Sequence, residues 1–326
     1  MSKSFTHAVL LAAAMLTLAA PEAFAGKLRI GHTTWVGYGP LYLARDLGYF
    51  KEAGLEVDLR TIEEGSLIMT AVAGGNLDGS ALTLDEIMKY RSPETCFKAV
   101  LTLDESHGGD GVLVNDEIKT IKDLKGKTVA MNEGSTSQFW FSILLAKQGM
   151  TAADVKIANM TADDAAAAFI AKRVPVAVTW EPHLSLVRKK KQGRVLVDSA
   201  STPGVIVDVI SLSCDVIEKR PADVAALVKG FYRAIDYMKK NPTKANTIMA
   251  KGVGGFLKDP KDFADAAKGV RFYDQPMNVT FMGTAAKPGE AAALIKLGGE
   301  VWSQVGKLKM PLDYAAMIES KFAVGP

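Results

Sequence analysis

The sequence has 326 residues, of which 48% are hydrophobic and 23% are charged, and its formal net charge is +3 at pH 7. This length is sufficient for a large core and two lobes, and the composition excludes an intrinsically disordered chain. The small net charge gives no reason to expect a nucleic acid partner.

The first 25 residues have the pattern of a secretory signal peptide. Lys3 precedes the apolar run AVLLAAAMLTLAA, and Ala23-Phe24-Ala25 is a small-x-small cleavage pattern. The run is shorter than the ~20 residues that span a bilayer. We therefore expect export, cleavage after Ala25, and a periplasmic protein without a membrane anchor. The two cysteines, Cys96 and Cys214, are far from this site, and their positions do not decide whether they form a disulfide.

The mature chain alternates strand-like and helix-like segments in two series. The first series predicts strands at 28–32, 55–62, 79–84 and 96–103, with helices at 40–54, 66–75 and 85–91. The second predicts strands at 128–131, 155–160, 176–180, 193–199 and 204–213, with helices at 136–148, 163–173 and 182–191. From residue 215 onward the pattern is largely helical, most clearly over 224–240. This alternation predicts an α/β fold with mainly parallel sheets.

The two series resemble each other when residues 69–90 are set over 165–186. Each then has a buried strand that ends in Thr, an apolar residue and an acid, followed directly by a helix. Functional groups in open α/β sheets gather at strand ends. Asp85 and Glu181 are therefore predicted to lie at matching rims of two similar lobes and to face each other.

The motifs of several enzyme classes are incomplete in this sequence. Tyr42 occupies the third glycine of the dinucleotide pattern, and Ile121 stands where a P-loop needs its first glycine. The mature chain has no G-x-S-x-G elbow, and His32, His107 and His183 lack zinc-ligand spacing. We expect no enzyme activity, no cofactor and no metal.

The segment GYGPLYLARDLGYFKEAGLEV is similar to the opening run of one protein family. The chain resembles the solute-binding proteins of ABC importers, of the nitrate/taurine/sulfonate type. Further segments of the same likeness are AGGNLDGSAL, IKDLKGKTVAMNEGSTS, VTWEPH and RPADVAALVKGFYRAIDYMKKNP, whereas AKRVPV replaces the family's G-x-x-D-A strand entry. The opening run is matched by Gly37, Tyr38, Pro40, Tyr42, Ala44, Gly48, Tyr49, Phe50, Gly54, Leu55 and Val57.

The resemblance implies a two-lobed periplasmic-binding-protein fold with a ligand cleft between the lobes. The chain would cross between lobes at about Asp110–Asn115 and Gly204–Ser211. The implied organisation is a signal peptide (1–25), the first part of lobe 1 (26–110), lobe 2 (111–207), and the rest of lobe 1 with the C-terminal helices (208–326). The implied partners are a small-molecule ligand and the permease subunits of an ABC transporter, with the protein acting as a monomer.

Strand ends and crossings place four acids and three aromatic residues at the predicted cleft, without lysine or arginine. Carboxylates and aromatic faces attract cations, so we expect a small cationic, amine-bearing or guanidine-like ligand. The predicted ligand-binding residues are Trp35, Tyr38, Ser66, Asp85, Asp110, Ser135, Thr136, Trp180, Glu181 and Asp208.

Other interpretations of these residues stay open. Asp85 and Glu181 also suit the first turn of a helix, and Trp180 also suits a core position. Asp110 and Asp208 also suit hydrogen bonds to a hinge backbone. The amides that follow Ser135 can hold an anion, so the alternative ligand is a small oxyanion such as a sulfonate, nitrate or carboxylate. Two further alternatives are a pyrimidine-type biosynthetic enzyme, since such enzymes share the fold, and a soluble sensor component that passes the ligand state to a membrane receptor.

Overall fold

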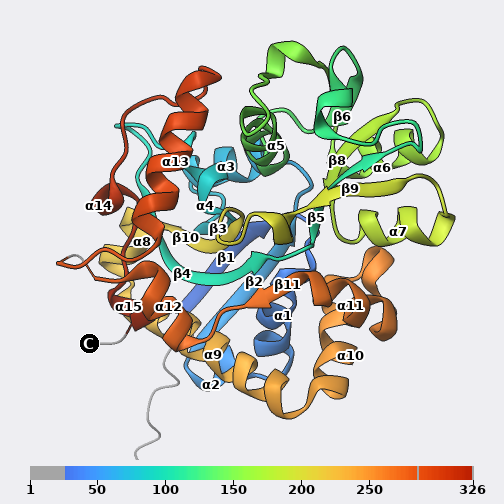
Figure 1. Cartoon of the computed structure of the whole chain (residues 1–326). Helices are drawn as coiled ribbons and strands as arrows, with labels where there is room; N and C mark the ends of the chain where they lie inside the picture. The colour runs from blue at the N-terminus through green and yellow to red at the C-terminus, as the bar shows by residue number, and fades with distance from the viewer. Residues whose placement is uncertain (1–25, 285, 325–326) are drawn as a thin grey trace, which may run out of the picture.

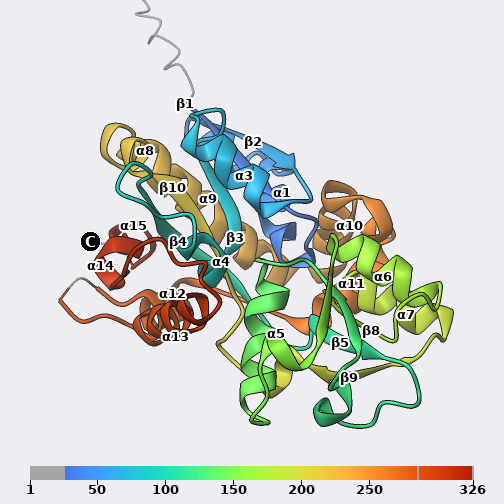
Figure 2. The same ribbon diagram turned by 90° about the horizontal axis from the view of Figure 1, so that it is seen from above.

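The computed structural model describes residues 26–284 and 286–324, so the predicted signal peptide lies outside the described residues. The strands form two separate β-sheets, each surrounded by helices (Figures 1 and 2). We call the larger sheet with its helices the first lobe and the smaller sheet with its helices the second lobe. The predicted α/β fold with two lobes is confirmed.

The first lobe has six strands in the order β11-β4-β10-β3-β1-β2, and the second has five in the order β7-β6-β8-β5-β9. The strands of the first lobe are β1 (Gly26–His32), β2 (Leu55–Thr61), β3 (Gly79–Thr83), β4 (Phe97–Ser106), β10 (Val207–Ser213) and β11 (Val270–Phe272). Those of the second are β5 (Asp110–Val114), β6 (Thr128–Met131), β7 (Lys156–Asn159), β8 (Val176–Trp180) and β9 (Arg194–Asp198).

Both sheets are mixed, so the prediction of mainly parallel sheets is wrong. β1 runs parallel to β2 and β3, and β6 runs parallel to β7 and β8. β10 is antiparallel to β3 and β4, β11 is antiparallel to β4, and β5 is antiparallel to β8 and β9. The two strands that follow a crossing, β5 and β10, enter the middle of the other sheet against the direction of their neighbours.

The chain crosses between the lobes slightly earlier than predicted. The first crossing is 107–109, between β4 and β5, and the second is 199–206, between β9 and β10. Asp110 and Asp208 therefore stand at the beginning of paired strands, where ladder hydrogen bonds hold their backbone. The lobe boundaries 26–110, 111–207 and 208–326 lie near these crossings, and we keep them as a proposal.

The helices cover both sheets, and α9 and α10 run along the first lobe beside α1 (Figure 1). Pro40 stands at the start of α1, where its missing N–H costs no hydrogen bond. The helices are α1 (Gly39–Asp46), α2 (Tyr49–Glu52), α3 (Gly65–Ala73), α4 (Leu84–Met88), α5 (Thr136–Ala146), α6 (Ala162–Ile170), α7 (His183–Lys190), α8 (Cys214–Lys219), α9 (Pro221–Lys240), α10 (Pro242–Val253), α11 (Pro260–Ala266), α12 (Gln275–Met282), α13 (Ala291–Gln304), α14 (Tyr314–Met317) and α15 (Lys321–Val324). Short 3-10 turns are η1 (Val36–Tyr38), η2 (Ile121–Leu124), η3 (Ala152–Asp154), η4 (Ser199–Ser201), η5 (Gly255–Leu257) and η6 (Ala267–Gly269).

A disulfide joins Cys96, just before β4, to Cys214, the first residue of α8, with a Cα–Cα distance of 5.4 Å. The neighbouring strands β4 and β10 bring the two cysteines together, although 118 positions separate them in the sequence. Within the described residues, no helix is both long enough and apolar enough to cross a membrane.

Candidate functional site

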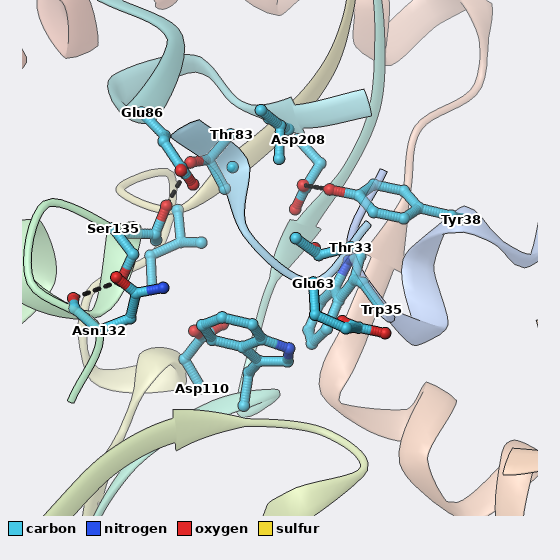
Figure 3. A pocket seen from close by; sticks show the side chains of 15 residues that line it. Thr33, Trp35, Tyr38, Glu63, Thr83, Glu86, Asp110, Asn132, Ser135 and Asp208 are labelled. Atoms are coloured by element: carbon cyan, nitrogen blue, oxygen red, sulfur yellow. Dashed lines mark hydrogen bonds between the residues drawn. The ribbon is translucent and has the colours of Figure 1, made fainter. Parts of the chain in front are cut away.

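A pocket lies where the two lobes meet (Figure 3). The empty space in this region is about 470 Å³, which includes open solvent. Its walls come from strand ends and helix starts of both lobes, as expected for open α/β sheets. The residues that line it are Thr33, Trp35, Tyr38, Glu63, Gly65, Leu82, Thr83, Glu86, Asp110, Asn132, Ser135, Thr136, Trp180, Ile206 and Asp208.

The loop between β1 and α1 supplies an aromatic wall from the first lobe. Trp35 Nε1 donates to Asp104 Oδ1 at 3.0 Å, and the Tyr38 hydroxyl donates to Asp208 Oδ1 at 2.5 Å. Gly37 lies between Trp35 and Tyr38 in the sequence, and a Cβ there would lie 2.2 Å from Trp35 Nε1 and 2.3 Å from Asp104 Oδ2. The glycine is therefore required by the close approach of this carboxylate and not by a bound phosphate.

The second lobe contributes Trp180 from the end of β8 and the start of α5. Trp180 Nε1 donates to the carbonyl of Thr34 at 3.0 Å, across the gap between the lobes. Ser135 caps α5 by accepting from the Ser137 amide at 3.1 Å. The other first-turn amides of a helix have no intrahelical acceptor, so those of α5 are free to bind an anion.

Other hydrogen bonds also join the two lobes around the pocket. Asn132 Nδ2 donates to Glu64 Oε2 at 2.9 Å, and the hydroxyls of Thr83 and Thr136 share a hydrogen bond. At the outer edge, Lys189 Nζ of α7 lies 2.5 Å from Asp262 Oδ1 of α11, two helices that are neighbours in Figure 1. The two lobes are therefore in direct contact around the pocket.

The carboxyl groups of this region are buried and hold protons unusually tightly. Burial raises the pKa of Asp110 to about 7. Burial, followed by the negative charge of Asp104, raises the pKa of Asp208 well above its usual value. Burial also raises the pKa values of Asp85 and Asp104, each to about 8. Near neutral pH, Asp85, Asp104 and Asp110 exchange between a neutral form that donates a hydrogen bond and an anionic form that only accepts.

Seven of the ten predicted site residues line the pocket: Trp35, Tyr38, Asp110, Ser135, Thr136, Trp180 and Asp208. Asp85 is fully buried behind the wall, where its Oδ1 lies 3.5 Å from Thr136 Oγ1 and its Oδ2 has no hydrogen-bond partner. Ser66 lines a neighbouring hollow, and its hydroxyl donates to Glu64 Oε1 at 3.1 Å.

Glu181 is outside the pocket, which corrects its predicted placement. Its carboxylate accepts from the Ser185 amide and hydroxyl, each at 3.0 Å, and pairs with Arg188 of α7. Asp85 and Glu181 therefore do not face each other. The acid after β8 stabilises the first turns of its own helix, the alternative that the sequence left open.

Sequence reasoning missed several lining residues, above all Glu63, Glu86 and Asn132. Asn132 follows β6 directly, so the strand-end rule that selected Asp85 applied to it equally. Glu86 is next to Asp85 in α4, and the direction of each side chain decides which one reaches the pocket. Within residues 26–284 and 286–324, no group of three or more His, Cys, Asp or Glu side chains is placed to hold a metal ion.

Known proteins with similar sequences are binding proteins. A putative binding protein of Brucella abortus is 24% identical over 293 residues, which cover 88% of each chain. A putative aliphatic sulfonates-binding protein of Bacillus subtilis is 28% identical over 216 residues, 63% of this chain and 64% of the relative. The taurine-binding periplasmic protein of Escherichia coli is 26% identical over 226 residues, 68% and 67% of the two chains.

Solved structures match over nearly the whole chain. The periplasmic aliphatic sulphonate binding protein SsuA of Escherichia coli superposes with a TM-score of 0.73 at 19% identity and covers 92% of this chain and 99% of its own. The periplasmic nitrate-binding protein NrtA of Synechocystis PCC 6803 has a TM-score of 0.69 at 14% identity, with 90% and 84% covered. These matches confirm the predicted periplasmic-binding-protein fold. Because the NMT1/THI5-like family pattern matches residues 35–245, the chain belongs to the NMT1/THI5-like family.

Proposed function

We propose that this protein is the periplasmic component of an ABC importer, exported with cleavage after Ala25, and that it binds a small solute without chemical change. The observation that carries the proposal is the pocket at the junction of the lobes, closed by the Trp180–Thr34 hydrogen bond. A ligand that contacts both walls stabilises the closed form, which the permease then recognises. The protein acts as a monomer.

The ligand of this proposal is a small oxyanion of the sulfonate type. Relatives named for aliphatic sulfonates and taurine support this choice, and they favour it over the cationic ligand predicted from the sequence. In this chain, the start of α5 with Ser135 and Thr136 offers amide and hydroxyl donors to such a group. Neutral carboxyl groups beside it would add further donors.

A cationic or amine-bearing solute is the second candidate, because one observation favours it. Asp110 and Asp208 line the pocket between Trp35, Tyr38 and Trp180, and no lysine or arginine is among the described lining residues. Ionised carboxylates and aromatic faces would hold an ammonium or amidinium group.

Titration calorimetry at several pH values separates the two candidates. A panel of alkylsulfonates, nitrate and carboxylates is compared with alkylamines and guanidine-like cations at pH 6 to 8.5. An oxyanion favours neutral carboxyls, so its affinity falls as the pH rises through about 7, the pKa of Asp110. A cation favours ionised carboxyls, so its affinity rises over the same range. If no solute of either class binds, the proposed function is wrong.

A further inference from the structure

The N-terminal ends of three helices lie at the pocket, and they differ in which side chains of the protein already contact their free amides. Gly65 begins α3, Thr83 directly precedes α4, and Ser135 caps α5, and all three residues line the pocket. α4 has only five residues, so α3 and α5 are the two helices long enough to provide an anion position.

The start of α3 is already occupied by carboxylates of the chain itself. The Glu64 side chain caps α3 by accepting from the Ser66 amide at 3.4 Å. Glu86 reaches the same place from α4, since a Cβ added to Gly65 would lie only 2.0 Å from Glu86 Oε1. Gly65 therefore leaves the space that Glu86 fills, and this carboxylate sits where the dipole of α3 would otherwise attract an anionic ligand.

Glu86 is buried, yet its carboxylate faces the pocket. The residue is 8% exposed and lines the cavity (Figure 3). The nearest cation is Lys89, whose Nζ lies 3.9 Å from Glu86 Oε1, beyond hydrogen-bond distance. Lys89 itself donates to the Gly134 carbonyl of the second lobe and to the Tyr90 hydroxyl. The other charged groups around this pair are Glu64, Asp85 and Lys307. Burial raises the pKa of Glu86, and the positive charge of Lys89 opposes this shift.

We propose that Glu86 is the residue that sets the net charge of the ligand, by acting as a resident anion at the start of α3. This inference rests on the proposed function and goes beyond it. With Glu86 in place, of the two helix starts of α3 and α5 only that of α5 stays free for an anionic group of the ligand. Removing the charge of Glu86 removes the salt-bridge partner of Lys89 and makes the net charge around the pocket more positive by one unit.

The test compares ligands of the same size and opposite charge. Calorimetric affinities for ethanesulfonate and ethylammonium are measured for the wild type, Glu86→Gln and Glu133→Gln. Glu133 is the matched control, because it is an exposed glutamate outside the pocket lining, paired with Lys307 at 3.4 Å. A unit charge a few ångströms from the ligand changes affinity by at least about tenfold at an effective dielectric constant near 20.

The ratio of the affinity for ethanesulfonate to the affinity for ethylammonium is therefore expected to rise at least about tenfold in Glu86→Gln. In Glu133→Gln this ratio stays within about threefold of the wild-type value. If Glu86→Gln has the same affinity ratio as the wild type, the inference is wrong but the proposed function still stands. A wild type that binds no solute overturns both. Urea unfolding monitors the fold of each variant, and Glu86→Met replaces Glu86→Gln if the amide variant does not fold, since it removes the same charge with similar volume.

Discussion

The buried carboxyl of Asp110 gives a stability prediction whose sign is fixed by its pKa. The folded-state pKa is raised from 3.8 to about 7, so the folded protein binds this proton more tightly than the unfolded chain. The protonated Asp110 carboxyl therefore stabilises the folded protein. This contribution to the free energy of unfolding is complete below about pH 4 and is lost as the pH rises through about 7. A shift of about three units corresponds to roughly 4 kcal/mol in total, of which about 2–3 kcal/mol falls between pH 5 and 8.

Replacing Asp110 by Asn imitates the protonated form and removes this pH dependence. Urea unfolding of the ligand-free protein at pH 5 and pH 8 gives the free energy of unfolding. The wild type should lose about 2–3 kcal/mol more than Asp110→Asn between these pH values. Asp116→Asn is the control, because Asp116 is exposed just after β5. Equal losses in the wild type and Asp110→Asn would refute the assignment of a raised pKa to this carboxyl.

Three further predictions concern single contacts. Removing the disulfide with Cys96→Ser and Cys214→Ser should lower the free energy of unfolding by about 5 kcal/mol, because the bond closes a loop of 118 residues. An unchanged urea midpoint would contradict the pairing. Trp180→Phe should weaken ligand binding about five- to tenfold, since it removes the hydrogen bond to Thr34 across the lobes, and calorimetry with the best ligand of the panel measures it. Glu181→Gln should leave the ligand affinity within about threefold of the wild-type value. It should lower the free energy of unfolding by about 1–3 kcal/mol, because the carboxylate accepts hydrogen bonds from Ser185 of α7. A large loss of affinity would place this residue at the pocket after all.

Local patterns in the sequence were enough to find seven of the fifteen residues that line the pocket. The alternation of segments predicted the α/β class, and the rule that functional groups follow strands selected Trp35, Trp180 and Ser135. This rule works because a strand end lies at the rim of its sheet whatever the rest of the chain does. The same rule also applies to Asn132, which directly follows β6, although it was not selected.

The sequence by itself therefore determined the class of fold, the family and the loops that form the cleft. The tertiary structure decided which side chain of each loop enters the cleft: Glu181 pairs with Arg188, and Glu86 rather than Asp85 lines the pocket. It also decided the antiparallel entry of β10 and the pairing of Cys96 with Cys214. These outcomes depend on partners far away in the chain, because the direction of a side chain and the neighbour of a strand are set by packing between segments and not by spacing along one segment.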